Sequence, residues 1–371
     1  MRSILLAMAL AATPAHAATR WDVRTSQGFD ALCALNVLSG DDYYVKQYPD
    51  EAKTFAAAPY AGARSAAREL KRVIKDEGGG IVSASLTLIF SGGPDSTLGA
   101  VLESARHPEA LASSLRASPY WSQESWDQFQ RVRPTVIAAL EAMHRAGFEK
   151  LWQHYLGDPK ARVESMRQEL SRYDVLGEQE RLIGHPLQNG KIEVILLWFS
   201  RPHGIRIQGG RFLTNIGYPT EIVLRNATHE PLHPPFDKSD PGVASAIATL
   251  GRDPLLASIV AKHDSSFGYN TIEGYVDEDA VQAMEQIVSE RLGVAKPAAE
   301  RWRDADDGMH LLAAALYDLM KESGFAERGG RFQEWFVAQV TKGALAPAEL
   351  ERRARAVVGD TLVDRWSAKT K

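Results

Sequence analysis

The stretch from residue 190 to residue 225 restricts the fold of this chain more than any other. Lys191–Phe199 reads KIEVILLWF, a β-rich apolar run of strand length. Three shorter candidate strands, each bounded by Gly or Pro, follow it: Gly204–Gln208, Arg211–Ile216 and Glu221–Arg225. Gly209-Gly210 lies between two of them and predicts a hairpin. No other part of the sequence has a convincing strand pattern, so we expect one small sheet, mixed or antiparallel.

Helical periodicity surrounds this stretch on both sides. Residues 20 to about 185 place apolar side chains at helical spacing in three segments: Ala61–Asp76, Pro134–Ala146 and Ala161–Tyr173. After Asp240 the same pattern returns in four more: Val276–Leu292, Gly308–Glu322, Arg331–Thr341 and Pro347–Val358. The order of helices, small sheet and helices predicts a mostly helical α+β fold rather than alternating βαβ units.

The beginning of the chain has the order of parts that is typical of a secretory signal peptide. Arg2 supplies the positive start, Ile4–Ala12 is an apolar run too short to span a bilayer, and Ala15-His16-Ala17 has the small-x-small form of a cleavage site. We therefore expect cleavage after Ala17 and an exported protein, periplasmic or secreted. Later segments contain no uninterrupted apolar run of membrane length, which predicts that no segment spans a membrane.

Charge and cysteine content narrow the classes of function. The 43 basic and 47 acidic residues are interspersed, so the chain offers no basic stripe for nucleic acid and no polybasic patch for a membrane. The one cysteine, Cys33, cannot pair within the chain, so an exported protein must rely on its core, on a metal, or on both. We divide the chain into a helical part at 18–185, a metal-site region at 186–300 and a C-terminal helical part at 301–371, with 18–371 as one compact unit the alternative.

A metal-binding motif directly follows the strand-like stretch. His229-Glu230-Pro231-Leu232-His233 satisfies the pattern HExxH. Two histidines four residues apart on a helix face the same way, so both imidazoles can bind one Zn²⁺. Glu230 would then face a water on the metal and could take its proton as the general base. Thr228 is the predicted N-cap of this helix.

The segment of about 190 to 290 resembles the gluzincin-like metallopeptidases, and most closely the bacterial family called domain of unknown function 4932. That family carries a distant Glu in the pattern Tyr-x-x-Glu-x-x-Val-x-Ala, and Tyr275, Glu278, Val281 and Ala283 match it. The resemblance implies that Glu278 is the third zinc ligand, in a zincin-like centre with the small sheet beside the HExxH helix. It also implies a hydrolase that cleaves a peptide or protein substrate, bound along the edge strand of the sheet.

Reasoning from the residues alone leaves the third ligand open. The helix after Asn270 has an apolar face formed by five residues: Ala280, Val281, Met284, Ile287 and Val288. If the helix begins at Asn270, this face projects back toward Glu273 and Asp277 more than toward Glu278. If the helix begins nearer Val276, Glu273 precedes it and the projection toward Glu273 is weaker. Glu273 therefore competes with the preferred Glu278. Three downstream residues are candidate donors to the reaction's oxyanion: Tyr269, His263 and His310.

Two other interpretations compete with the hydrolase. Pro231 is tolerated in a first helical turn, but Pro234 pushes His233 away from helical angles. The motif would then be a Pro-rich loop, and the chain a non-catalytic, zinc-stabilised scaffold or peptide-binding protein. Separately, Ser91-Gly-Gly-Pro-Asp-Ser96 matches the phosphate-binding loop of ATP pyrophosphatases. The alternative for that loop is a turn in which Asp95 or Ser96 caps the next helix.

Overall fold

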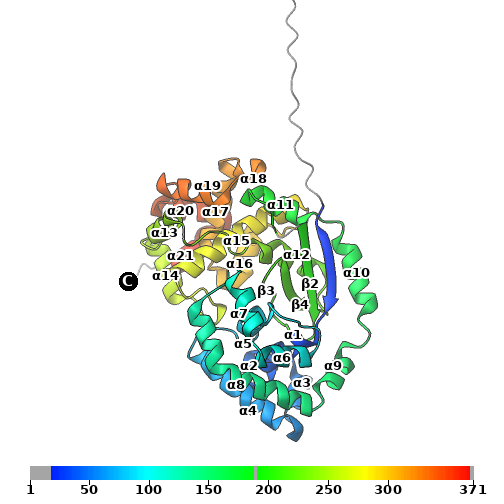
Figure 1. The fold of residues 1–371 in the computed structure, drawn as a ribbon. Helices are drawn as coiled ribbons and strands as arrows, with labels where there is room; N and C mark the ends of the chain where they lie inside the picture. Colours follow the sequence, from blue (N-terminus) through cyan, green and yellow to red (C-terminus); the bar gives the residue numbers. More distant parts are fainter. Residues whose placement is uncertain (1–17, 188–189, 368–371) are drawn as a thin grey trace, which may run out of the picture.

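A four-stranded mixed sheet organises the computed structural model, which describes residues 18–187 and 190–367 (Figure 1). The strands have the order β1-β2-β4-β3 and the following bounds: β1 Arg20–Thr25, β2 Lys191–Leu197, β4 Arg211–Asn215 and β3 Ile205–Ile207. β1, β2 and β4 run parallel, and β3 is antiparallel to β4. The predicted mostly helical α+β class is therefore confirmed. The predicted signal peptide, residues 1–17, lies outside the described residues.

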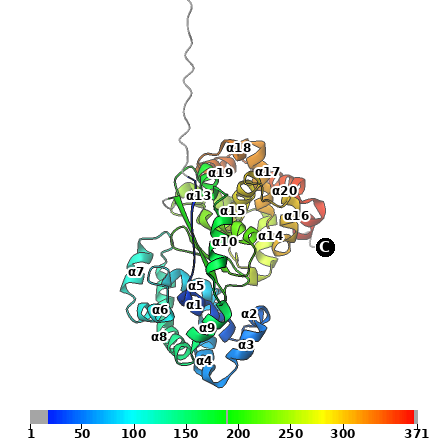
Figure 2. The same cartoon turned by 90° about the vertical axis from the view of Figure 1, so that its right-hand side faces the viewer.

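The sheet separates two hydrophobic cores. Along β2, Val194 and Leu196 face a core formed with the C-terminal helices, whereas Ile195 and Leu197 face a core formed with the N-terminal helices. Burial on both faces explains why this strand reads as a continuous apolar run rather than an alternating one. Figures 1 and 2 show the consequence, with the helices of residues 27–156 gathered on one side of the sheet and the late helices on the other.

Of the helices before the second strand, those at residues 27–156 form the N-terminal side, whereas the two at residues 160–183 contribute Met166, Leu170 and Leu182 to the other core. Their bounds are α1 Gln27–Leu38, α2 Asp42–Gln47, α3 Pro49–Phe55, α4 Ala61–Leu70, α5 Val82–Phe90, α6 Leu98–Arg106, α7 Glu109–Arg116, α8 Gln123–Arg145, α9 Phe148–Leu156, α10 Lys160–Leu170 and α11 Val175–Ile183. The predicted helix Ala61–Asp76 is α4 followed by a π-helical turn, Lys71–Asp76. Pro134, where we predicted a helix start, lies inside the longer α8.

The helices after the sheet form the C-terminal side. Their bounds are α12 Thr220–His229, α13 Pro241–Leu250, α14 Pro254–Lys262, α15 Ile272–Arg291, α16 Ala298–Asp304, α17 Leu311–Glu322, α18 Phe325–Arg328, α19 Phe332–Thr341, α20 Pro347–Val358 and α21 Asp360–Trp366. Helix α15 packs against several of its neighbours and is buried over most of its length. It buries Glu278, Asp279 and Glu285 among its apolar residues. Because a buried charge is costly unless it is paired, these acids require nearby cations or donors.

Two strand predictions were wrong. Glu221–Arg225 belongs to helix α12, because Val223, Leu224 and Ala227 form one buried helical face despite their β-rich composition. Strand β1 was missed because its charged residues at an edge of the sheet hide the strand pattern. The predicted hairpin is confirmed, since β3 and β4 pair on either side of Gly209, whose φ of 77° suits a glycine.

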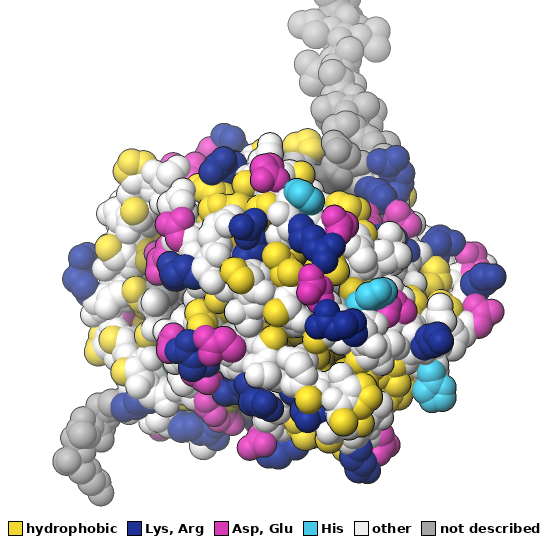
Figure 3. Space-filling view, turned by 60° about the horizontal axis from the view of Figure 1, so that its bottom comes forward, with side chains coloured by type: hydrophobic (Ala, Val, Ile, Leu, Met, Phe, Trp, Pro, Cys, Tyr) yellow, Lys and Arg dark blue, Asp and Glu magenta, His cyan; other side chains and the backbone are white. Residues whose placement is uncertain are grey.

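The surface of the molecule carries charged side chains of both signs. Figure 3 shows acidic and basic side chains interspersed on one face of the molecule, in keeping with the nearly balanced charge. Within the described residues, no single helix has both the length and the hydropathy to cross a membrane. α13 and α14 reach these values only together, and they are bent by 82° relative to each other.

Candidate metal centre

The HExxH segment is not one continuous helix. Helix α12 ends at His229, Glu230–Leu232 form a single 3-10 turn, and His233 is extended, with φ −86° and ψ 140°. Pro234 accounts for the extended backbone of His233, as the sequence predicted. Thr228 is not an N-cap, because it lies buried near the end of α12. The break in the helix still leaves the two imidazoles facing each other, with 3.2 Å between the Nε2 atoms of His229 and His233.

Glu278 of helix α15 completes a cluster of three metal-binding side chains. Its Oε1 lies 3.6 Å from Nε2 of His229, and its Oε2 lies 3.4 Å from Nε2 of His233. In a tetrahedral zinc site the ligand atoms are about 2.0–2.1 Å from the metal and so about 3.3–3.4 Å from one another. The observed separations of 3.2–3.6 Å therefore fit one zinc ion, and the donor set of two imidazoles and a carboxylate fits its chemistry.

The structure brings Glu278, and not Glu273, to the histidines. Glu273 is exposed and lies 3.3 Å from Nζ of Lys238. At about 100° per residue, positions 273 and 278 point about 140° apart around the helix. The apolar-face projection favoured Glu273 because α15 is buried nearly all round, so its apolar residues define no single direction. Asp277 lies at the margin of the cluster, 3.9 Å from Nδ1 of His233.

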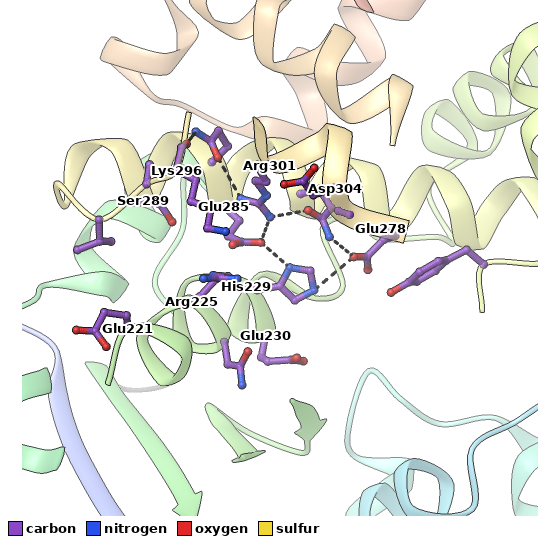
Figure 4. A pocket seen from close by; sticks show the side chains of 17 residues that line it. Glu221, Arg225, His229, Glu230, Glu278, Glu285, Ser289, Lys296, Arg301 and Asp304 are labelled. Carbon is purple, nitrogen blue, oxygen red and sulfur yellow. Dashed lines mark hydrogen bonds and ion pairs between the residues drawn. The ribbon is translucent and has the colours of Figure 1, made fainter. Parts of the chain in front are cut away.

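A second layer of polar side chains orients the cluster (Figure 4). Nδ1 of His229 is 2.9 Å from Oε2 of Glu285, which also accepts from Arg301. Gln282 donates to Oε1 of Glu278 over 2.8 Å. With Nδ1 donating to Glu285, His229 turns the lone pair of Nε2 toward Glu278 and His233, as metal-binding histidines commonly do.

Sequence reasoning missed these supporting residues, although a signal for them existed. Glu278, Gln282 and Glu285 follow the i, i+4, i+7 spacing of a single helix face. Acidic and amide side chains that repeat along one helix face in this way indicate a polar function for that face. Arg301 has no such signal, because it reaches Glu285 from the separate helix α16.

The electrostatics of the cluster favour a positive charge at His229. Burial lowers the pKa of His229, but the charges of Glu278 and Glu285 outweigh it and raise the pKa to about 9. Burial raises the pKa of Glu278, and the neighbouring His229 and His233 reverse this and hold it well below its usual range. Burial lowers the pKa of His233. The two carboxylates therefore create a position that stabilises a cation, whether a proton or a metal ion.

Three cavities meet at this cluster. The main cavity, of about 850 Å³, lies between the N-terminal helices and the cluster and is lined by both histidines, Glu230, Tyr269 and Glu278. A side cavity of about 930 Å³ adjoins it and is lined by the Pro-rich segment that contains His233. A small cavity of about 400 Å³ lies against His229 and Glu285. Substrate-sized space is therefore available directly beside the candidate ligands.

Glu230 lies at the site, in both the main and the small cavity. Figure 4 shows its side chain next to that of His229, on the side of the cluster away from helix α15. Burial raises the pKa of its carboxylate, and the charge of His229 acts in the opposite direction. A raised pKa suits a general base, because the pKa of the carboxylate then lies closer to neutral pH.

Of the three candidate oxyanion donors, the structure places only Tyr269 beside the cluster. Its side chain lines the main cavity, and burial together with the charge of Glu278 raises its pKa well above normal. The ring of His263 instead contacts two backbone carbonyl oxygens, those of Ile259 and Gly268. His310 is buried between Asp279 and Asp306, at 2.6 and 3.0 Å.

The Ser91–Ser96 loop has a structural role in the described fold. Arg24 binds both carboxylate oxygens of Asp95, at 2.7 and 2.8 Å. The backbone oxygen of Asp95 accepts from Ser26 and Gly28. Helix α6 is capped by Thr97, and not by Asp95 or Ser96 as we predicted. Asp95 therefore attaches the loop to the junction of β1 and α1.

Comparisons with protein families, with curated proteins and with solved structures gave no match for this chain. The resemblance to the gluzincin-like metallopeptidases thus stays a prediction from the motif residues. The functional conclusions that follow depend on the geometry of the site.

Proposed function

We propose that this protein is an exported zinc-dependent hydrolase of the metallopeptidase type. His229, His233 and Glu278 would hold one Zn²⁺, and Glu230 would be the general base. The observation that carries the proposal is the convergence of the three donor atoms, with separations of 3.2–3.6 Å, in a cavity that also contains Glu230. Three protein ligands leave a fourth position for water or substrate, as is typical of catalytic rather than structural zinc sites.

The side chains around the cluster have matching roles in peptide hydrolysis. When bound, zinc supplies a Lewis acid that lowers the pKa of water toward neutrality. Glu230 would accept the proton of the attacking water and return it to the leaving amine. The hydroxyl of Tyr269 would donate a hydrogen bond to the oxyanion that develops on the substrate carbonyl. Glu285 and Gln282 would hold His229 and Glu278 in the orientation that binds the metal.

The edge strand β3 supports a peptide as substrate. It has a sheet partner on one side only, and it lies next to the Glu230–Leu232 turn. An extended peptide could therefore pair with β3 and pass the metal site. The resemblance of the motif residues to gluzincins agrees with this interpretation.

A non-catalytic zinc scaffold is the second candidate. The observation that favours it is the burial of Glu278 and Glu285 in helix α15, because a cation would stabilise these acids whether or not catalysis occurs. One variant separates the two functions. Glu230→Gln should retain stoichiometric zinc, measured by elemental analysis, and lose hydrolysis of a quenched fluorescent peptide library. Zinc-loaded wild type without activity would favour the scaffold, and activity that survives in the variant would remove Glu230 from its role.

A further inference from the structure

Arg206 is a cation at the site that the proposed reaction does not use. It occupies the middle of edge strand β3, directly opposite Phe212 of β4. Residues directly opposite each other in an antiparallel pair share a face of the sheet. Phe212 faces the C-terminal core, whereas Ile205 and Ile207 face the N-terminal core. The side chain of Arg206 therefore extends on the face of the sheet that carries the HExxH segment.

The guanidinium of Arg206 is held in place without a carboxylate partner. Its Cζ lies 4.3 Å from the centre of the Tyr120 ring, and the Tyr120 hydroxyl donates to the backbone oxygen of His233. This stack fixes the plane of the guanidinium beside the end of the motif. Nη1 is buried and has no hydrogen-bond partner. An unpaired buried donor of a charged group is costly, so its retention needs an explanation.

The other basic side chains of the two large cavities are paired. Lys75 binds Asp41, Lys238 binds Glu273 and Asp277, and Arg331 binds Glu334. Among the Lys and Arg residues that line these cavities in the described part of the chain, Arg206 alone has no ion pair. It also lines both cavities, so its guanidinium stands where they meet.

Arg206 lines the main cavity together with Glu230 and both histidines, so it can reach a substrate bound there. Burial raises the pKa of Glu230, while the charge of His229 and then that of Arg206 lower it. Burial lowers the pKa of His233, and the charge of Arg206 contributes in the same direction. The positive charge of Arg206 thus affects the pKa of both Glu230 and His233.

We propose that Arg206 is the substrate-recognition residue of this site and that it binds a carboxylate of the peptide substrate. The planar fork of arginine matches a carboxylate with two parallel hydrogen bonds, and Arg206 lines both large cavities, from which a carboxylate can approach its guanidinium. The carboxylate is either the C-terminus of the peptide or an acidic side chain close to the cleaved bond. This inference rests on the proposed function only in taking the ligand to be a peptide.

The test measures binding separately from hydrolysis. The zinc-loaded Glu230→Gln protein is titrated with a fluorescein-labelled hexapeptide of alanines around one phenylalanine, by anisotropy. One version ends in a carboxamide, one ends in a free carboxylate, and a third set is amidated and carries Glu at each position in turn. We expect a carboxylate to tighten binding about 10- to 100-fold, as for a hydrogen-bonded charged pair. Preference for the free terminus or for one Glu position identifies the source of the carboxylate.

Variants of Arg206 decide the assignment. Adding Arg206→Gln should abolish the preference for a carboxylate and leave binding of the amidated neutral peptide within about threefold. Arg206→Lys keeps the charge without the fork and should retain only part of the preference, so it provides the test if the Gln variant does not fold. Arg145→Gln on the exposed end of helix α8 is the matched charge control and should change nothing.

Specific results would overturn the inference. If amidated, free and Glu-containing peptides bind alike, or if Arg206→Lys keeps the full preference, Arg206 does not recognise a carboxylate. If Arg206→Gln in the active protein slows cleavage of all peptides equally, it acts on the reaction rather than on selection. Cleavage without carboxylate preference would refute only this inference. Arg206-dependent carboxylate binding without zinc or cleavage would refute only the proposed function.

Discussion

The support that Glu285 gives to His229 leads to a sharp prediction about metal affinity. Glu285 is 2% exposed, and its Oε2 lies 2.9 Å from Nδ1 of His229. Glu285→Gln keeps the shape of the side chain but removes the charge that makes the imidazole a stronger donor to a metal. Loss of such a supporting carboxylate typically weakens metal binding about 10- to 100-fold, or about 1.4–2.7 kcal/mol. We expect the dissociation constant for zinc to rise by this factor.

The control substitution for this prediction lies on the same helix as Glu285. Zinc affinity is measured by competition with a chromophoric chelator at fixed pH and ionic strength. Glu290→Gln removes a carboxylate from the same helix α15, where it binds Lys321 away from the cluster. This control should bind zinc as the wild type does. Equal affinities for wild type and Glu285→Gln, or equal losses in both variants, would refute the role that we assign to Glu285.

Three further predictions concern catalysis and pH. Glu230→Gln should lower kcat by about 10²- to 10⁴-fold at unchanged zinc content, measured with a peptide that the wild type cleaves. Tyr269→Phe should lower kcat by about 10- to 10³-fold with little change in KM. A rise in KM at unchanged kcat would indicate a binding role instead. Burial lowers the pKa of His310, but Asp279 and Asp306 raise it to about 10. Its folded pKa thus exceeds the unfolded value of about 6.5, so its contribution to stability is complete below about pH 6.5 and is lost as pH rises through about 10. The difference in unfolding free energy between wild type and His310→Gln, measured in urea, should shrink over that range, and a difference that grows with pH would contradict this sign.

The parts of the fold that the sequence predicted are those with strong local signals. Helix α20 has the predicted bounds because Pro347 starts it and Gly359 follows its end. The β3–β4 hairpin follows from its glycines. Helix α12 was mistaken for a strand because Glu221–Arg225 is too short for its periodicity to outweigh its β-rich composition. Tertiary packing against the sheet decides such segments.

The candidate site was predictable only in part. The HExxH pattern identifies His229 and Glu230 without knowledge of the fold. We singled out Glu278 by resemblance, because the apolar residues of a helix buried on nearly all sides give no direction, and the polar line of Glu278, Gln282 and Glu285 went unrecognised. Arg206 was not predictable, since its role depends on a stack with Tyr120, which is distant in the sequence. Contacts of this kind arise from tertiary structure and leave no local pattern.

The most direct test of the central claim is X-ray absorption spectroscopy at the zinc edge of the purified, zinc-loaded protein. We predict one zinc per chain, with two imidazole nitrogens and a carboxylate oxygen at about 2.0–2.2 Å. We also predict that this signature disappears in His233→Ala and persists in His263→Ala, whose ring contacts two backbone carbonyl oxygens. Zinc that binds with the same spectrum in both variants, or that does not bind to the folded wild type, would contradict the claim.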